Sequence, residues 1–506
     1  MTRRIAILTG TFMACLCMAS QTFGDFNLAA IFRDHAVLQR DVAVPIWGTG
    51  KPGNNVTVSF GDQVVKETIT SEGSWRVTLK PMPANGQGQE LRVGQGSSEI
   101  VIREVVIGEV WLAAGQSNMQ FGVRGTLNKQ PGAKEFVDAA LARSNGPSVR
   151  FRRINEDADD ELHDDLSGND PWVIVSDKTV GQFSAVAWVF AERLRADLKV
   201  PIGIIDVSWG GKPIEGFIPR TGFAKHKLLK TILELADKNR TPELANLPGG
   251  YIVRNKAGYP GSIYGARMHP IRGYAMCGFL WYQAESNCGR GEDPRDYRVK
   301  QHAMVESWRE AWGNETLPVY YVQLPNYRDE ATGWIRMREE QRRALATPNT
   351  AMAVTIDTGS SDIHPANKID VGERLALIAL SRNYGKKVID SGPMYDKHQV
   401  NGRQVRVSFK HADGLHVALK EGLSAPQLIK TADVSGFELA GADGVWHEAS
   451  AHIDGKGIVV QSDKVAKPVE IRYLCTNTPD GGLLYNKAGL PASPFCSRLD
   501  WLPWKK

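Results

Sequence analysis

A serine stands directly after an apolar run in the segment Glu109–Met119, E-V-W-L-A-A-G-Q-S-N-M. Gly115 ends the run, and Gln116, Ser117 and Asn118 are the first polar side chains. This pattern predicts a strand that ends in a tight turn carrying Ser117. A serine held at a strand end beside a histidine can act as a nucleophile. The same residues would equally suit a structural turn or a helix N-cap, so the turn alone assigns no function.

Three further polar clusters each follow an apolar segment that we predict as a strand. They are Trp209-Gly210-Gly211-Lys212-Pro213, Gln283-Ala284-Glu285-Ser286-Asn287 and Asp362-Ile363-His364-Pro365. The predicted strands are Val105–Ala114, Ile202–Ser208, Met276–Tyr282, Val319–Leu324 and Ala351–Ile356. Because parallel strands end at one edge of a sheet, these clusters and Ser117 should meet there.

Together these residues could perform nucleophilic catalysis. Ser117 needs a base, because a hydroxyl is a poor nucleophile near neutral pH. His364 is the candidate, since the ordinary histidine pKa of about 6.5 suits a general base. Asp362 could orient the imidazole or stabilise its charged form. The groups that could hold an oxyanion are the backbone N–H of Ser117, that of Gly210 or Gly211, and the Asn287 side-chain amide.

Each of these residues also has a purely structural explanation. His364 could be a loop histidine before Pro365, the two glycines could be only a turn, and Asn287 could cap a helix. His269 lies upstream of the third strand, at the opposite end, so we interpret it as structural. We expect no catalytic metal, because the remaining lone histidines show no metal-ligand spacing; examples are His35, His163, His302 and His411.

Between residues 104 and 385, helical patterns alternate with the predicted strands. They cover Phe183–Leu198, Asp296–Trp312, Trp334–Leu345 and Lys368–Asn383. Such alternation is typical of a parallel sheet covered on both faces. Five strands predict a flavodoxin-like, three-layer α/β/α domain.

Short strands with turn signals between them flank this region. Residues 25–103 contain Ala43–Gly48, Val56–Phe60 and Trp75–Leu79, a pattern that predicts a β-sandwich-like domain. Residues 386–506 contain Val405–Phe409, Ile458–Val460 and Val469–Tyr473. This C-terminal β-rich region is either a second β domain or a partner of the first.

Residues 1–24 have the pattern of a secretory signal. Arg3 and Arg4 precede the apolar stretch Ile5–Ala19, which is shorter than the roughly 20 residues of a membrane span. We therefore expect export to the periplasm or beyond the cell, in preference to a lipid anchor on Cys15. Without the two arginines the chain has 59 basic and 56 acidic side chains, a net charge of +3. That balance is too weak to favour nucleic acid or an anionic membrane as a partner.

Four cysteines remain outside the predicted signal. They are Cys277, Cys288, Cys475 and Cys496. An even number in an exported protein permits disulfides, and Cys475 with Cys496 is the favoured pair.

Given these residues, the chain resembles the sialate O-acetylesterase-type carbohydrate esterases of the SGNH hydrolase superfamily. The similar blocks are G-Q-S-N-M at 115–119, S-W-G-G-K-P-I-E at 208–215, W-Y-Q-A-E-S-N at 281–287 and D-I-H-P-A-N-K at 362–368. Two more lie at 32–41 and 486–495. The resemblance implies that 104–385 is an SGNH hydrolase domain. It also implies hydrolysis of sugar acetyl esters by Ser117 and His364, with oxyanion donors from Gly210 or Gly211 and Asn287, and no cofactor.

Two positions depart from the family pattern. Ala284 stands where the family usually has glycine, so a methyl group enters a place of close backbone approach. Ser361 stands where the superfamily often has the aspartate of a triad, which leaves Asp362 or a backbone carbonyl to support His364. We also expect substrate contacts from the blocks; the residues are Gln116, Trp209, Gln283 and Glu285.

Three other functions are alternatives to this one. An α/β-hydrolase would need a second glycine where Met119 stands. A glycosidase could use Glu285 with Asp357 or Asp362. A carbohydrate-binding protein without activity could stack Trp209, Trp281 and Tyr282 on sugars. The sequence does not distinguish acetylated sialic acid from acetylated xylan or another glycan as the substrate, and it does not determine the oligomeric state.

Overall fold

The computed structural model describes residues 26–142, 148–289, 291–327, 333–502 and 504. The predicted signal at 1–24, with Cys15, lies outside these described residues. In the described part of the chain, no helix combines the length and apolar character needed to cross a bilayer.

Six parallel strands form the centre of the molecule, in the order β9-β11-β8-β12-β13-β14, with the short strand β10 (Val173–Ile174) antiparallel at one edge. The six are β8 (Ser98–Gly115), β9 (Val149–Arg153), β11 (Ile202–Asp206), β12 (Gly278–Tyr282), β13 (Val319–Val322) and β14 (Thr350–Ala353). All five predicted strands are present, and β9 is an addition. Without β9 the order is 2-1-3-4-5, the order of a flavodoxin-like sheet.

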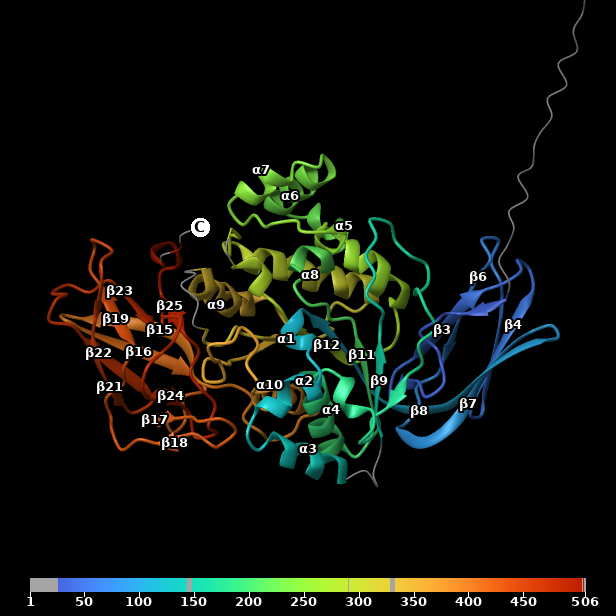
Figure 1. Ribbon diagram of the computed structural model, residues 1–506, viewed down its shortest axis with the longest axis horizontal. Coiled ribbons are helices and arrows are strands. Elements are labelled where there is room, and N and C mark those ends of the chain that lie inside the picture. The colour runs from blue at the N-terminus through green and yellow to red at the C-terminus, as the bar shows by residue number, and fades with distance from the viewer. Residues whose placement is uncertain (1–25, 143–147, 290, 328–332, 503, 505–506) are drawn as a thin grey trace, which may run out of the picture.

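Helices cover both faces of this sheet (Figure 1). Adjacent residues of a strand point to opposite faces. Trp111 of β8 packs on Phe190, with ring centroids 5.1 Å apart, and lies beside Gly278 of β12. The next residue, Phe279, therefore faces the other way, where it packs on Trp308 at 4.9 Å. Phe190 belongs to α4 (Ala185–Leu198) and Trp308 to α8 (Tyr297–Trp312).

The four predicted helices are present, and several others were not predicted. The predicted ones are α4, α8, α9 (Gly333–Arg343) and α10 (Lys368–Arg382). The others are the short α1 (Ser117–Gln120) and α2 (Val123–Thr126), then α3 (Ala133–Ala142), α5 (Arg220–Phe223), α6 (Lys227–Asp237) and α7 (Thr241–Asn246). In Figure 1, α6 and α7 project beyond α5 and α8 at the top of the molecule.

The N-terminal β region shares a strand with the central sheet. The first part of β8 pairs with β7 and β2, while its last part is a central parallel strand. The predicted boundary between residues 103 and 104 therefore falls inside β8. The other strands are β1 (Asn27–Leu28), β2 (Val37–Gln39), β3 (Val44–Thr49), β4 (Asn55–Phe60), β5 (Gln63–Thr68), β6 (Ser74–Leu79) and β7 (Asn85–Gln95).

The C-terminal β region lies at the opposite end of the molecule from the N-terminal one (Figure 1). Its order is β15-β16-β22-β21, β18-β17-β24 and β20-β19-β23-β25 in three sheets. Phe495 stacks on Tyr395 at 4.2 Å and so joins two of them. The strands are β15 (Met394–Asn401), β16 (Gln404–Lys410), β17 (His416–Leu419), β18 (Gln427–Leu428), β19 (Phe437–Ala440), β20 (Trp446–Glu448), β21 (Ser450–Asp454), β22 (Gly457–Gln461), β23 (Glu470–Tyr473), β24 (Leu483–Tyr485) and β25 (Phe495–Cys496).

The predicted disulfide between Cys475 and Cys496 is not formed in the structure. Both are free thiols, as are Cys277 and Cys288. The two thiols are hydrogen-bonded neighbours, and this bond lowers the pKa of Cys496 while burial raises that of Cys475.

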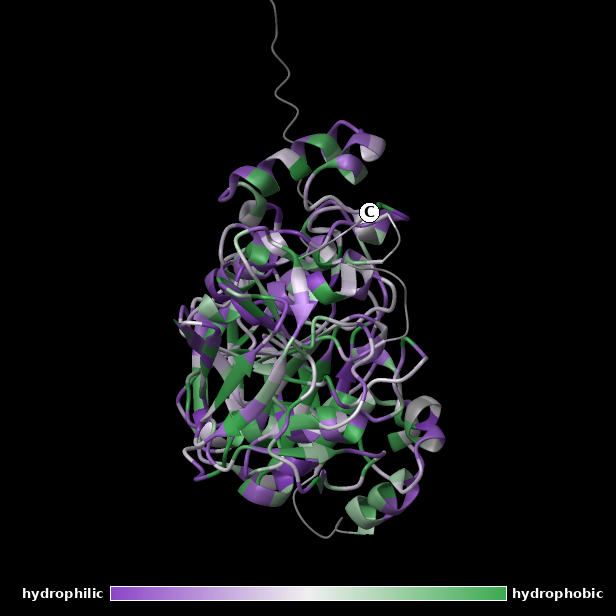
Figure 2. Cartoon of the chain, turned by 90° about the vertical axis from the view of Figure 1, so that its left-hand side faces the viewer, coloured by the Kyte–Doolittle hydropathy of each residue, from purple (hydrophilic) through white to green (hydrophobic). Residues whose placement is uncertain are grey.

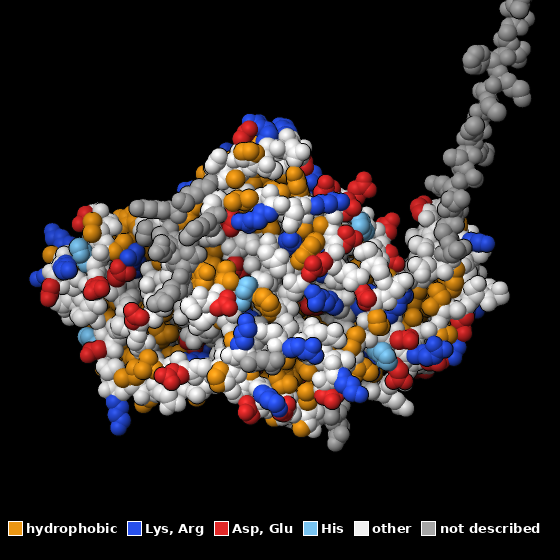
Figure 3. Space-filling view, viewed as in Figure 1, with side chains coloured by type: hydrophobic (Ala, Val, Ile, Leu, Met, Phe, Trp, Pro, Cys, Tyr) orange, Lys and Arg blue, Asp and Glu red, His pale blue; other side chains and the backbone are white. Residues whose placement is uncertain are grey.

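Hydrophobic and hydrophilic residues alternate along the chain. Figure 2 shows hydrophobic stretches on strands and helices beside hydrophilic ones. On the face in Figure 3, Lys and Arg side chains are interspersed with Asp and Glu. This mixed surface agrees with the weak net charge of the sequence.

Candidate active site

The turn that carries Ser117 depends on a close contact between two strands. Gly115, the last residue of β8, has φ +133°, and a Cβ atom there would lie 2.1 Å from the carbonyl oxygen of Tyr282. Only glycine fits this position. The Gln116 N–H donates to the same oxygen at 2.9 Å. The chain then turns into α1, which begins at Ser117.

His364 lies against Ser117, although 247 residues separate them. The His364 Nε2 atom is 2.9 Å from the Ser117 Oγ atom. Phe121 packs edge-on against the imidazole, with ring centroids 4.5 Å apart. The predicted meeting of these two loops at one edge of the sheet is confirmed. The distance is that of a nucleophile and its base.

The chain just after His364 is held by the start of α10 and by the C-terminal region. The Asn367 side chain accepts a hydrogen bond from the Asp370 N–H at the start of α10 and donates to the Gly422 carbonyl of the C-terminal region. Lys420 pairs with Asp370 at 2.7 Å. The C-terminal region therefore helps to position the imidazole.

The electrostatics keep His364 ready to accept a proton. Partial burial lowers its pKa below the ordinary value of 6.5; Asp362 raises it and Lys368 lowers it further. The imidazole is therefore mostly neutral at pH 7, and a neutral imidazole is the form that acts as a base.

Asp362 lies near His364 without a hydrogen bond to the ring. Its Oδ1 atom is 3.7 Å from Nδ1, beyond hydrogen-bond range. The same oxygen accepts the backbone N–H of His364 at 3.0 Å. The Asp362 side chain is 57% exposed, so water screens its charge. Asp362 therefore stabilises the loop through a backbone hydrogen bond. The only support for its prediction as the triad acid is that its charge raises the pKa of His364.

We expect Asp362→Asn to reduce kcat/KM by less than about 10-fold, far from the roughly 10⁴-fold loss that removal of a triad aspartate gives. Wild-type activity should fall as the pH drops through the lowered pKa of His364, below 6.5. Because the Asp362 charge raises that pKa, its removal should move the acidic limb to still lower pH. The pH profile of kcat/KM with p-nitrophenyl acetate measures both effects.

Ser361→Ala is the matched control, since Ser361 is an exposed neighbour on the same loop. It should leave the profile in place. A loss near 10⁴-fold in Asp362→Asn would instead make Asp362 the triad acid.

Two backbone N–H groups on the serine loop and the glycine loop are candidates to hold an oxyanion. Within the described residues, neither the Ser117 N–H nor the Gly211 N–H donates a hydrogen bond. Gly211 has φ +69°, which favours glycine. Gly210 packs on the Ser117 side chain, but its N–H already donates to the Gln120 Oε1 atom at 2.7 Å. Gly210 could therefore act only if Gln120 moved.

Asn287 is held firmly in a buried network. Its Oδ1 atom accepts from the Ile214 N–H at 3.0 Å and from Gln283 at 2.8 Å. Its Nδ2 atom donates to the Glu215 carboxylate at 2.9 Å, and Glu215 pairs with Lys300 at 2.5 Å. A role as oxyanion donor would need the second N–H of this amide and remains a prediction.

Asn118 joins three of the loops that meet at the carboxyl edge of the central sheet, which we call the rim. Its amide donates to Glu285 and, at 3.0 Å, to the Ile363 carbonyl beside His364, and its Oδ1 atom accepts from Lys368. Burial lowers the pKa of Lys368 to about 7 and raises that of Glu285. Asn118 is thus a positioning residue that fixes the His364 loop relative to Ser117.

Three of the four residues predicted to contact substrate are buried in the same rim. The Gln283 amide donates to Gln116 at 3.1 Å and to the Lys212 carbonyl at 3.2 Å, and Gln283 has no exposed surface. Gln116 and Glu285 are also buried. These side chains hold the loops together, and as placed they do not offer a surface to a sugar. Trp209 is half-buried, with Lys212 Nζ 4.7 Å from its ring centre.

The structure corrects three other predictions. Trp281 and Tyr282 are fully buried, so they cannot stack on a sugar. Asp357 forms a two-pronged ion pair with Arg374 at 2.6 and 2.7 Å, which leaves it unsuited to glycosidase chemistry. Ala284 has φ +154°, a backbone conformation that favours glycine, and its methyl group is buried.

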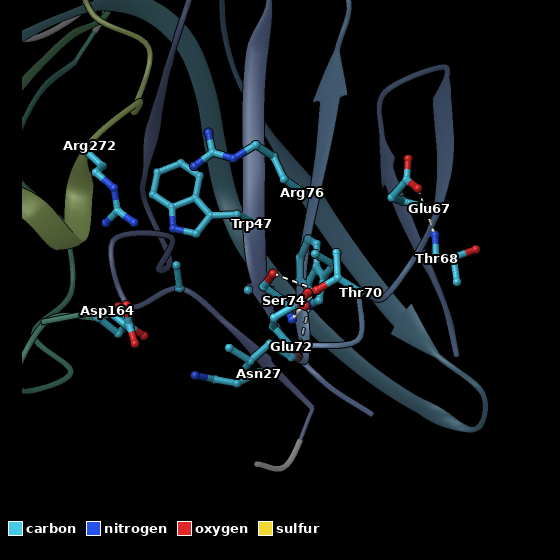
Figure 4. Close-up of a pocket in the computed structure, with 15 residues that line it drawn as sticks. Asn27, Trp47, Glu67, Thr68, Thr70, Glu72, Ser74, Arg76, Asp164 and Arg272 are labelled. Carbon is cyan, nitrogen blue, oxygen red and sulfur yellow. Dashed lines mark hydrogen bonds between the residues drawn. The ribbon is translucent and has the colours of Figure 1, made fainter. Parts of the chain in front are cut away.

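A cavity of about 740 Å³ lies elsewhere, in the N-terminal β region (Figure 4). Its lining contains none of the predicted site residues. The Arg76 guanidinium covers the Trp47 ring at 4.8 Å, and Arg272 and Asp164 lie nearby on other elements. Arg76 therefore covers one face of the Trp47 ring in this cavity.

Four residues of the site had no role predicted from the sequence: Asn118, Gln120, Phe121 and Lys368. Asn118 and Lys368 do lie inside the similar blocks, and this position was the available signal. Gln120 and Phe121 follow the first block directly and carried no signal of their own.

Comparisons with known proteins agree on one family. A family model described as carbohydrate esterase, sialic acid-specific acetylesterase, matches residues 249–381. Sialate O-acetylesterase from Mus musculus is 29% identical over 445 residues, which cover 77% of this chain and 79% of the mouse protein. The Homo sapiens protein of the same name is 27% identical, with 82% of each chain covered. The crystal structure of a carbohydrate acetylesterase from Xanthomonas citri is 32% identical and covers 94% of this chain and 99% of its own, with a TM-score of 0.79.

Proposed function

Because the chain belongs to the sialate O-acetylesterase-type carbohydrate esterases, we propose that it removes O-acetyl groups from sugars by serine–histidine catalysis. The observation that carries the mechanism is the 2.9 Å contact between Ser117 Oγ and His364 Nε2. The strand order and the serine, glycine, asparagine and histidine blocks support an SGNH-type three-layer domain as its scaffold.

In the first half of the reaction, Ser117 attacks the acetyl carbonyl carbon while His364 takes the hydroxyl proton. The carbonyl oxygen becomes an oxyanion, which the N–H groups of Ser117 and Gly211 and the second N–H of the Asn287 amide stabilise. Removing one such donor typically reduces turnover about 10²–10³-fold. The C–O bond to the sugar then breaks, and His364 returns the proton to the leaving alcohol.

In the second half, water takes the place of the sugar alcohol. His364 removes a proton from this water as it attacks the acetyl-enzyme, and the same donors hold the second oxyanion. Collapse of this intermediate releases acetate and restores the Ser117 hydroxyl. Nothing in this cycle calls for a metal or an organic cofactor.

We propose that acetylated sialic acid is a better substrate than acetylated xylan. The support is that the matching family model is described as sialic acid-specific and that the mouse relative is named sialate O-acetylesterase. Acetate release from O-acetylated sialic acid, acetylated xylan and another acetylated glycan tests this. Ser117→Ala serves as the blank. Faster release from xylan would reverse the order of substrates, and no release from any acetylated sugar would contradict the proposed function.

We also propose that the enzyme acts outside the cytoplasm. The support is the basic and apolar pattern of residues 1–24, which is typical of a secretory signal. Sequencing the N-terminus of the protein from its native host tests it. A mature chain that begins near Asp25 is expected, whereas one that retains Arg3 and Arg4 would contradict export by cleavage.

A further inference from the structure

We propose that His226, His302 and Glu306 form a binding site for a divalent transition metal, best suited to Zn²⁺, that ties the α6–α7 extension to α8. The site is separate from the Ser117–His364 pair, and the esterase mechanism does not use it. It follows from the positions of three side chains and does not depend on the proposed function.

Three ligand atoms converge from two parts of the chain. His302 and Glu306 are one turn apart on α8, and His302 Nε2 lies 3.2 Å from Glu306 Oε1. His226 comes from the residue before α6, and its Nε2 atom lies 3.8 Å from Glu306 Oε2. All three atoms fall within 4.8 Å of one another.

These distances are near those of a tetrahedral zinc site. Zinc binds imidazole nitrogen at about 2.0–2.1 Å and carboxylate oxygen at about 2.0–2.2 Å, so neighbouring ligand atoms lie roughly 3.4 Å apart. The His302–Glu306 pair already meets this spacing, and small side-chain rotations would bring His226 in. Two imidazoles and one carboxylate are a donor set that zinc uses, with a fourth position left for water.

The imidazoles are arranged as ligands should be. The His302 Nδ1 atom lies 3.0 Å from the Thr347 hydroxyl, which leaves Nε2 directed toward the site. Metal-bound histidines commonly have such a partner on the second nitrogen. The His226 Nε2 atom is buried and has no hydrogen-bond partner among the described residues. A buried ring nitrogen without a partner is costly unless something binds it.

The surroundings leave room for a metal and its water. A cavity of about 280 Å³ borders both histidines and Thr347. Arg298 and Arg343 also line it, and both lie in ion pairs: Arg298 with Glu340 at 2.7 Å and Arg343 with Glu339 at 2.6 Å. These two carboxylates also pair with Arg336 and Arg342. Among the described residues, the ion pairs of Glu306 are with the two imidazoles.

The site would act as a clamp. The α6 and α7 helices project from the body of the molecule (Figure 1). His226 stands at the start of α6, while His302 and Glu306 lie in the middle of α8, which packs on the central sheet. A metal held by all three would cross-link the extension to the core. Since the metal binds only the folded form, it would also stabilise the protein.

Calorimetric titration of the full-length, chelator-treated protein with Zn²⁺ tests the proposal. We expect one Zn²⁺ per chain and a higher melting temperature when zinc is present. Zinc binding should weaken about 100-fold or more in each of the ligand variants His226→Gln, His302→Gln and Glu306→Gln. Loss of a residue that only hydrogen-bonds to a metal ligand already weakens metal binding about 10–100-fold. Thr347→Val removes only the hydroxyl that contacts His302 Nδ1, and it should weaken zinc binding by about 10-fold.

His452→Gln is the matched control, since His452 is an exposed histidine on β21. It should bind zinc like the wild type. Hydrolysis of p-nitrophenyl acetate shows that each variant is folded, and Glu306→Gln at a partly exposed position carries the test if a histidine variant fails to fold. No zinc binding by the wild type, or wild-type affinity in all three ligand variants, would overturn the proposal.

Discussion

Replacing Ser117 by alanine should reduce kcat for p-nitrophenyl acetate by about 10⁴–10⁶-fold, the range expected when the nucleophile of a serine hydrolase is removed. The substitution deletes one oxygen from a half-buried side chain and leaves the Asn118 network that positions the loop. The fold should therefore persist while the covalent step is lost. Steady-state kinetics and thermal denaturation of the same samples measure the two effects separately.

Ser286→Ala is the matched control for this variant. Ser286 lies on the same rim, and its backbone N–H, which the substitution keeps, donates to Gln116 at 3.1 Å. Its activity should stay near that of the wild type. If Ser117→Ala kept most of its activity, the nucleophile would have to be another group.

Replacing His364 by alanine should reduce kcat by a similar factor, because the serine then has no base to take its proton. The two residues act as one unit, and the effects of such units are far from additive. The double variant Ser117→Ala/His364→Ala should therefore be no slower than Ser117→Ala alone. Measuring kcat for the wild type, the two single variants and the double variant completes a double-mutant cycle.

His452→Gln again supplies a control histidine far from the rim, and it should keep full activity. Losses that add in the double variant would contradict the pairing, since they would mean that Ser117 and His364 contribute to separate steps. A fully active His364→Ala would assign the base to a different residue.

The sequence predicted the central sheet because most residues of its strands are apolar. The exception is β9, with the sequence V-R-F-R-R, in which Arg150 and Arg152 are buried. Arg150 donates to the His35 carbonyl at 2.9 Å, and Arg152 contacts the Ala30 carbonyl at 3.4 Å. These partners come from distant backbone, so a local pattern could not show that the arginines are tolerated inside. The strand was missed for this reason.

The loops of the site were predictable, but the contacts within them were not. Strand ends predicted that Ser117 and His364 would meet, because topology places them on one edge. Whether an amide faces a ligand or a neighbouring side chain depends on three-dimensional contacts. Asn287 donates to Glu215, which lies 72 positions away in the sequence, and no spacing rule connects the two.

The proposed metal site was not predicted from the sequence, for a related reason. His302 was interpreted as a lone histidine, although Glu306 follows one helical turn later. The third ligand, His226, precedes α6, a helix that was not predicted. The pair on α8 was visible in the sequence, but only the fold brings the third residue to it.

The central claim is that Ser117 is an activated nucleophile, and labelling with a serine-directed organophosphate tests it most directly. Mass spectrometry of the digested protein should find one adduct, on the peptide that contains Ser117, with loss of esterase activity in step with labelling. Ser117→Ala and His364→Ala should not be labelled. A wild-type enzyme that hydrolyses acetyl esters but forms no adduct at Ser117 would contradict the account.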